Sequence, residues 1–419
     1  MADDSAGARP YDSIDLSSRA FWSQPAHGRE RSFATLRAHR PLSWHPPVAD
    51  ALMDDPDDPG FWAVVRHADI VEISRRTDVF VSGQGVIFEN VPEEMLEMSQ
   101  SFLAMDDPRH GKLRRLISAA FTPRQIARIT ESIDANAKTV VQELAAAGPG
   151  SDFVRTCSSQ LPMRTLSDMM GVPEAERATV ADAADDLVSW ADPEHVAGRD
   201  RMGMLFESTL ELHRVALALA EQRRAEPADD LMTALVQAEV DDERLLDEEI
   251  SAFFVLLAVA GNDTTRQTTS HAVHALTTFA EQRDWLAAGF EARIGTAVEE
   301  FLRWATPVMT FRRTAVADVE LHGHTVRAGE KVVMFYSSGN RDETVFAGPG
   351  VLDLGRAPNP HLAFGGGGSH FCLGAQLART QLKAILRELL NQLPDLRAQE
   401  PEYLAGNFIH AIRAMPCTF

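Results

Sequence analysis

The stretch best suited to chemistry is a glycine-rich loop that ends in a cysteine, Phe364-Gly365-Gly366-Gly367-Gly368-Ser369-His370-Phe371-Cys372-Leu373-Gly374. Consecutive glycines permit backbone conformations that other residues avoid, and they let the chain approach a flat partner closely. Cys372 stands just before an apolar helix predicted to begin near Ala375, and a helix N-terminus favours a thiolate over a thiol. Such a thiolate suits a haem iron as axial ligand, because it donates electron density that promotes O–O cleavage.

The loop alone leaves other interpretations open. A buried cysteine is most often an inert small hydrophobic residue. A glycine-rich loop before a helix can instead bind phosphate, but no Lys-Ser/Thr pair follows these glycines. A structural zinc site needs more Cys and His at metal-binding spacing than this sequence has.

A second candidate site lies in the apolar stretch Ser251 to Gly261 and in the polar residues that follow it, Asn262-Asp263-Thr264-Thr265. A helix that is apolar almost all round is buried, and polar residues in its middle are locally costly and tend to mark function. A threonine can bond the carbonyl four residues back and open a groove in the helix. Gly261 would leave room for a diatomic ligand. The plain alternative is a kinked core helix with a capping threonine.

The cysteine loop resembles the haem-binding signature of the cytochromes P450, Phe-x-x-Gly-x-His/Arg-x-Cys-x-Gly. Phe364 lies one residue further from Cys372 than in the general signature. The longer form is similar to that of the bacterial subgroup that hydroxylates sterol side chains and methyl-branched lipids. The resemblance implies haem b (heme, iron protoporphyrin IX) with Cys372 as its metal ligand and with Phe364 and Gly374 beside it. It also implies the helical, triangular P450 fold.

The polar segment of the apolar helix resembles the family's acid–alcohol pair. The resemblance implies that Asp263 relays protons from solvent, as a general acid does, and that Thr264 stabilises the activated oxygen. Helical spacing places Leu256, Val259 and Ala260 on the same side of the helix as this pair. We expect these three residues to face the haem and the substrate.

Four further residues resemble the family's anchors for the two haem propionates, which call for cationic or N–H donors. His110 and Arg114 are four apart and share a helix face, as in the family's His-x-x-x-Arg pair. Arg313 matches its strand arginine, and His370 completes the set. Arg312 should face the other way, because adjacent strand residues point to opposite faces.

Glu300, Arg303 and Arg356 resemble the family's buried Glu-Arg-Arg network behind the haem. By itself the first pair would be an ordinary surface ion pair of a helix. Within the network, loss of one partner is expected to cost several kcal/mol.

The resemblance also implies partners. These are O2, an apolar small molecule, a ferredoxin and an NAD(P)H-dependent ferredoxin reductase. A basic stretch of an otherwise acidic chain is the expected docking patch for the ferredoxin, although an ordinary charged helix face is the plainer interpretation. It contains Arg109, Lys112, Arg115, Arg124 and Arg128.

Apolar residues dominate the segments that would line the substrate pocket, so we expect an apolar ligand. They include Ile87, Phe88, Leu96, Val308 and Phe408. The subgroup resemblance implies terminal hydroxylation of a methyl-branched lipid or of a cholestenone-like sterol side chain. A terpenoid or macrolide hydroxylase is the alternative enzyme. A haem-based gas or redox sensor and a cysteine hydrolase that uses Cys372 and His370 are alternatives of other classes.

The rest of the chain must position these residues. It has 45% hydrophobic residues, enough for a large core, and a net charge of −21 that disfavours nucleic acid and anionic membranes. Sparse cysteines and the lack of a signal peptide or membrane span predict a cytoplasmic protein without a membrane anchor. We expect a polar N-terminal tail over residues 1–20 and one P450 domain over residues 21–419.

Periodicity predicts a mainly α fold with small β-sheets. Strands are expected at Trp62 to Val65 and within Asp318 to Tyr336. The expected helices span Ala181 to Trp190, Leu231 to Glu239, Glu248 to Ser270, Ala272 to Gln282, Thr296 to Trp304 and Ala375 to Asn391.

Overall fold

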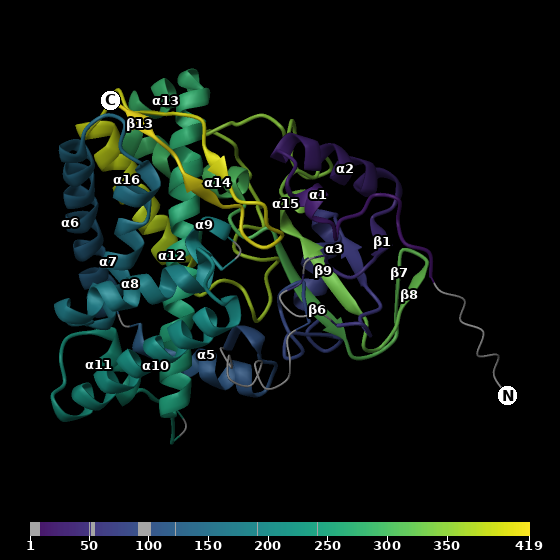
Figure 1. Cartoon of the computed structure of the whole chain (residues 1–419), viewed down its shortest axis with the longest axis horizontal. Helices are drawn as coiled ribbons and strands as arrows, with labels where there is room; N and C mark the ends of the chain where they lie inside the picture. Colours follow the sequence, from purple (N-terminus) through teal and green to yellow (C-terminus); the bar gives the residue numbers. More distant parts are fainter. Residues whose placement is uncertain are drawn as a thin grey trace.

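The computed structural model describes residues 9–49, 51, 55–90, 102–121, 123–190, 192–240 and 242–419. Figure 1 shows most of the helices on one side of the molecule and the main sheet with α1, α2, α3 and α15 on the other, and the long helix α12 runs through the helical part. The predicted mainly α fold with small sheets is confirmed. Leu96 lies outside the described residues, so its predicted place in the pocket stays a prediction.

The helical elements, including short 3-10 and π turns (η), are α1 (Arg19–Trp22), α2 (Ala26–His39), α3 (His67–Arg75), η1 (Phe102–Ala104), α5 (Arg109–Ala120), α6 (Pro123–Ala147), η2 (Val154–Ser158), α7 (Gln160–Met170), α8 (Glu174–Val188), α9 (Pro193–Val196), α10 (Arg201–Ala225), α11 (Leu231–Gln237), α12 (Asp247–Thr278), α13 (Ala280–Ala287), α14 (Phe290–Ala305), α15 (Tyr336–Gly339) and α16 (Ala375–Gln392).

Helix α12 corrects the expectation of two helices that meet near residue 271. It continues to Thr278 because its polar residues find partners inside the fold. Ser270 Oγ donates to the Arg266 carbonyl at 3.0 Å, and its oxygen lies at hydrogen-bond distance, 2.8 Å, from Ser158 Oγ of η2. A buried polar group with a hydrogen bond costs little, so these residues need not end the helix.

The part of the molecule opposite the helices is built on the main β-sheet. The strands are β1 (Leu42–His45), β2 (Phe61–Val64), β3 (Phe80–Val81), β4 (Glu239–Val240), β5 (Glu243–Arg244), β6 (Thr310–Ala315), β7 (Val319–Leu321), β8 (His324–Val326), β9 (Lys331–Phe335), β10 (Arg397–Ala398), β11 (Glu402–Tyr403), β12 (Ile412–Ala414) and β13 (Cys417–Thr418). Among the described residues, five strands form the sheet in the order β1-β2-β9-β6-β3. Strands β2 and β9 pair in parallel and are buried throughout, as continuous apolar runs predict. The predicted strands within Asp318 to Tyr336 are β7, β8 and β9.

The C-terminal segment returns to the helical part. In Figure 1 it lies beside α12 and α14. The Ala398 amide donates to Thr277 Oγ1, the Ile412 amide donates to Gln267 Oε1, and the Met415 amide donates to Asp152 Oδ1. This segment therefore binds α12 at two positions and the segment before η2 at a third.

Near the other end of the chain, residues 9–18 of the expected tail lie against the sheet. The Asp12 amide donates to the Trp44 carbonyl of β1, and Leu16 is fully buried. Within the part of the chain that the structure describes, no helix combines the length and the apolar character needed to cross a membrane.

Candidate functional site

The cysteine loop closes on itself before α16. The Cys372 amide donates to the Phe364 carbonyl at 3.1 Å. Helix α16 begins at Ala375 with Gly374 as its N-cap, as the sequence predicts. The guanidinium of Arg379 lies 4.4 Å from the centre of the Phe364 ring. The loop and the first turns of α16 thus form one unit around the sulfur.

The four glycines of the loop are needed for two different reasons. Gly365, Gly367 and Gly368 have φ angles of +92°, +95° and +76°, a region that residues with a Cβ rarely adopt. Gly366 instead sits tight against α3. A Cβ there would lie 2.5 Å from Ser74 Oγ and 2.9 Å from the Ile70 carbonyl oxygen, so only glycine lets the loop approach α3 this closely.

Opposing effects act on the pKa of the Cys372 thiol. Burial raises its pKa, whereas the Gly374 N–H and the guanidinium groups of Arg114 and Arg379 act to lower it. A bound metal cation would add to the lowering effects and favour the thiolate. His370 does not serve as a base for this thiol: its Nε2 lies 3.2 Å from Ser82 Oγ, and no hydrogen bond among the described residues joins it to Cys372. The hydrolase alternative therefore lacks its geometry.

The four expected propionate anchors lie around the loop as a cluster. Neither of the two arginines, Arg114 and Arg313, forms an ion pair with an acidic side chain among the described residues. The rings of His110 and His370 are 4.2 Å apart, and Arg114 donates to the Ser369 and Phe371 carbonyls at 2.7 and 2.8 Å. Burial, followed by the charges of Arg313, His110 and Arg114, lowers the pKa of His370 to about 3.

His110 is the clearest sign that this cluster expects a ligand. It is 1% exposed, and neither ring nitrogen has a hydrogen-bond partner in the described part of the chain. Its Nδ1 comes only within 3.8 Å of Asp107. Buried polar groups normally have partners, so two carboxylates such as haem propionates fit this cluster. Arg312, as expected, faces elsewhere and donates to Glu89 and Gln84 carbonyls.

Two residues in the middle of the continuous helix α12 are exposed. Ala260 and Gly261 are exposed, although Ala258 and Asn262 on either side are buried. A Cβ on Gly261 would meet nothing within 4 Å. Thr264 Oγ1 donates to the Ala260 carbonyl at 2.8 Å, the bond predicted from the sequence. An open space beside a core helix fits a bound cofactor, so the residues present fit haem.

Asp263 faces a different set of partners, which sequence reasoning missed. Its Oδ1 accepts from Arg266 at 2.7 and 3.0 Å and from Gln267 at 3.0 Å. Arg266 also donates to Asp185 of α8 at 3.0 Å, a carboxylate whose side chain is 44% exposed. The available signal was the spacing, since residues three and four positions after Asp263 share its helix face.

The predicted Glu-Arg-Arg network is present and buried. Glu300 binds Arg303 at 2.7 Å and Arg356 at 3.1 Å, and both side chains of the first pair are 0% exposed. Arg303 also donates to the carbonyls of Asn340 and Pro349. The network therefore joins α14 to the segment that leads into the cysteine loop.

Most expected pocket residues keep partial exposure inside the fold. These are Ile87, Leu256, Val259, Val308 and Phe408. The Met309 amide donates to the Phe408 carbonyl at 2.7 Å, which brings the segment after α14 beside the C-terminal loop.

The structure corrects the prediction that Phe88 lines the substrate pocket. It is 3% exposed and packs between Phe61, Trp22 and Phe335 of the sheet-side core. Its burial in this aromatic cluster is stabilised by the large apolar area of the ring, so it does not line the pocket.

The basic stretch is largely neutralised by acids from distant parts of the chain. Arg109 pairs with Glu249 and Lys112 with Glu243. Arg124 and Arg128 share Asp229 at 2.9 and 3.8 Å. Arg115 is exposed, and it is the one member of the five without an ion pair to another described residue.

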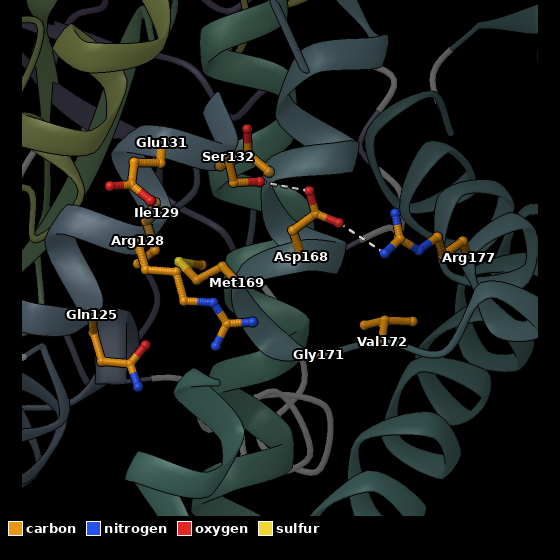
Figure 2. Close-up of a pocket in the computed structure, with 11 residues that line it drawn as sticks. Gln125, Arg128, Ile129, Glu131, Ser132, Asp168, Met169, Gly171, Val172 and Arg177 are labelled. Atoms are coloured by element: carbon orange, nitrogen blue, oxygen red, sulfur yellow. Dashed lines mark hydrogen bonds and ion pairs between the residues drawn. The ribbon is translucent and has the colours of Figure 1, made fainter. Parts of the chain in front are cut away.

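A separate cavity of about 540 Å³ lies among α6, α7 and the start of α8 (Figure 2). Asp168 on its wall accepts hydrogen bonds from Ser132 and Arg177. Arg128 of the basic stretch lines it, but none of the candidate haem, proton-relay or substrate residues does, so it is not the site described above.

Comparison with known proteins bears directly on this geometry. A family profile described as Cytochrome P450 matches residues 295–394. The chain is 41% identical over 413 residues to a methyl-branched lipid omega-hydroxylase of Mycobacterium tuberculosis (strain ATCC 25618 / H37Rv), covering 98% of this chain and 95% of the relative. It is 38% identical over 392 residues to a steroid C26-monooxygenase of Mycolicibacterium smegmatis, covering 91% and 88%.

A solved structure agrees. A cytochrome P450 of Mycobacterium marinum in complex with pseudoionone superposes with a TM-score of 0.94 at 66% identity, over 99% of this chain and 100% of that one. The predicted fold and cofactor are thereby confirmed, and the monooxygenase relatives decide against a sensor. This chain belongs to the cytochrome P450 family and is a haem-thiolate monooxygenase.

Proposed function

We propose that the enzyme hydroxylates the terminal carbon of a methyl-branched apolar chain. The balanced reaction is RH + O2 + 2H⁺ + 2e⁻ → ROH + H2O. The observation that carries the proposal is near full-length similarity to relatives named for methyl-branched lipid omega-hydroxylation and for steroid C26 oxidation. The first name specifies the omega carbon of a methyl-branched lipid, and the second specifies carbon 26 of a steroid.

The solved complex of the Mycobacterium marinum relative supports a compact isoprenoid as a further substrate type. Pseudoionone is an acyclic ketone with methyl branches along its chain, so it shares the branched terminus with the lipids. The partly exposed apolar residues Leu256, Val259 and Phe408 suit such a chain, because apolar walls with few polar groups bind apolar ligands. Terpenoid hydroxylation is therefore the second candidate.

Haem bound through a cysteine thiolate supplies oxygen activation and insertion of one oxygen atom into a C–H bond. The chain's residues do the rest. Cys372 would hold the iron, with Phe364 and Gly374 beside the sulfur. His110, Arg114, Arg313 and His370 would hold the propionates by charge-assisted bonds.

Proton delivery would fall to Asp263 and Thr264. Asp263 would pass a proton toward the Thr264 hydroxyl and recover one from solvent, along the side where Arg266 and Asp185 reach the surface. Thr264 can donate only one hydrogen, which it gives to the Ala260 carbonyl in the resting geometry. Its oxygen keeps free lone pairs, so it can accept a hydrogen bond from a neighbour, and it can take up a proton only as its own hydrogen is passed on.

Electrons would come from a ferredoxin reduced by an NAD(P)H-dependent reductase. Arg115 is the exposed cation of the basic stretch that is left for an acidic partner, and local charge complementarity can steer association despite the net charge.

The test is incubation of the holoenzyme with reconstituted ferredoxin and reductase and with three substrates: pseudoionone, a methyl-branched fatty acid and cholest-4-en-3-one. Mass spectrometry locates the added oxygen. We expect oxygen at the branched terminus of at least one of them. Oxidation only at internal carbons, or no product with any of the three, would refute the proposal. Leu256→Phe should shift the product pattern, and an unchanged pattern would remove Leu256 from the substrate wall.

A further inference from the structure

Gln267 is a buried residue that no motif of the sequence singled out. It is 1% exposed and lies one helical turn after Asp263 on α12. Its Nε2 donates to Asp263 Oδ1 at 3.0 Å, and its Oε1 accepts from the Ile412 amide at 2.8 Å. A backbone N–H can only donate, so Ile412 fixes the orientation of the Gln267 amide and turns its NH2 group toward Asp263.

In this orientation, Gln267 adds an N–H donor at Asp263 Oδ1. Three N–H groups point at that oxygen, two from Arg266 and one from Gln267. A carboxylate oxygen has about two lone-pair sites, so Oδ1 has no site left for a proton. No hydrogen bond to Oδ2 comes from any described residue.

We infer that Gln267 is a positioning residue that leaves Oδ2 as the proton-carrying oxygen of Asp263. The inference rests on the relay proposed above. A proton enters and leaves Asp263 at Oδ2, while Oδ1 stays bound. The same amide ties the carboxylate to β12, directly after the loop that carries Phe408. Without Gln267, only Arg266 holds Oδ1, so the carboxylate loses its link to β12 and its orientation is less restricted.

The competing explanation is that Gln267 merely satisfies the Ile412 amide. The two differ in what they predict for Gln267→Met, which keeps the size but loses both bonds. With pseudoionone as probe, a positioning role predicts that the fraction of NADPH electrons found in product falls about threefold or more, because misdirected proton delivery releases hydrogen peroxide instead. It predicts a changed solvent deuterium isotope effect and an unchanged dissociation constant from the substrate-induced Soret shift.

Two matched variants complete the experiment. Gln381→Met removes another buried glutamine, on α16, and should leave the product fraction unchanged. Gln267→Glu keeps an acceptor for Ile412, but it replaces the N–H donor by a second carboxyl group that competes with Asp263 for a proton, so it should lower the product fraction as well. A crystal structure of either Gln267 variant should show the Asp263 carboxylate rotated from its present position.

The outcomes separate the inference from the relay. If folded, haem-loaded Gln267→Met and Gln267→Glu keep the wild-type product fraction and isotope effect, Gln267 is only structural and the inference is overturned. Asp263→Asn tests the relay itself. If that variant keeps its product fraction, the relay fails and the inference falls with it. If only Asp263→Asn is impaired, the relay stands without Gln267.

Discussion

Arg266 Nη2 lies 2.7 Å from Asp263 Oδ1, and both side chains are almost fully buried in the wall of α12. The same guanidinium reaches Asp185 of α8 at 3.0 Å. One arginine thus links the carboxylate in the core to a second carboxylate at the surface.

The first prediction follows from this pair. Arg266→Leu leaves the Asp263 charge buried without its cation, which should lower the free energy of unfolding by about 3–5 kcal/mol. Urea denaturation measures it. In an Asp263→Asn background, the same change should cost much less, because no buried charge is left unpaired. Equal costs in both backgrounds would contradict the ion pair as the cause.

Gly366 gives a prediction about cofactor loading. Gly366→Ala would place a methyl group against Ser74 and the Ile70 carbonyl, so the loop must move away from α3 at a cost of about 1–3 kcal/mol. We expect a lower ratio of haem to protein and a weaker carbon monoxide band in the ferrous form. Gly350→Ala, where a Cβ meets nothing within 4 Å, is the control and should load normally.

Arg303 should be essential for folding. Arg303→Ala leaves Glu300 as a buried carboxylate with fewer partners and should cost about 3–5 kcal/mol. Yield of soluble, haem-loaded protein and far-UV circular dichroism report the loss. Arg214→Ala breaks an exposed pair with Glu211 and should change little. Normal recovery of Arg303→Ala would remove the network from the structural core.

Stability should depend on pH through His271. Burial lowers its pKa from 6.5 to about 4, so the unfolded chain binds the proton more readily than the folded one. The contribution is therefore fully present above pH 6.5 and is lost as the pH falls toward 4, by about 1.4 kcal/mol per pH unit. His271→Gln should flatten this part of the unfolding curve. The exposed His27→Gln should not, and identical slopes for all three proteins would refute the assignment.

Electron transfer should be more sensitive to Arg115 than to Lys112. Lys112 already pairs with Glu243 at 2.7 Å, whereas Arg115 is exposed. Arg115→Glu should slow reduction by ferredoxin several-fold at low salt and less at high salt, because exposed charges are screened. Stopped-flow measurement across ionic strength checks this. Equal rates for wild type, Arg115→Glu and Lys112→Glu would exclude docking at this stretch.

The sequence predicted the parts of the site that depend on local chemistry. The glycine run, the Thr264 bond to the Ala260 carbonyl and the Glu300–Arg303 pair all involve residues close in sequence, where spacing determines contact. The partners of Arg109 and Lys112 could not be predicted, because Glu249 and Glu243 are 140 and 131 residues away.

Some predictions about the fold were wrong or missing because they also depend on contacts between distant parts of the chain. The end of α12 was misplaced because Ser270 and His271 find buried partners that only the tertiary fold supplies. Phe88 was assigned to the pocket because an apolar side chain fits a pocket wall and a core equally well. Helices α6 and α10 were not among the predicted ranges. In α10, polar and apolar residues are spread around the helix and obscure the apolar repeat, whereas the apolar face of α6 was overlooked.

The bonds from residues 398–415 to Asp152, Gln267 and Thr277 span 263, 145 and 121 positions of the chain. Contacts so remote in sequence form slowly, since loop closure must precede any gain from them. We therefore expect the carboxylate of α12 to acquire its fixed amide neighbour late in folding. Partly folded molecules would then lack the fixed Asp263 carboxylate. During refolding, the fraction of NADPH electrons found in product should therefore recover only in the last phase.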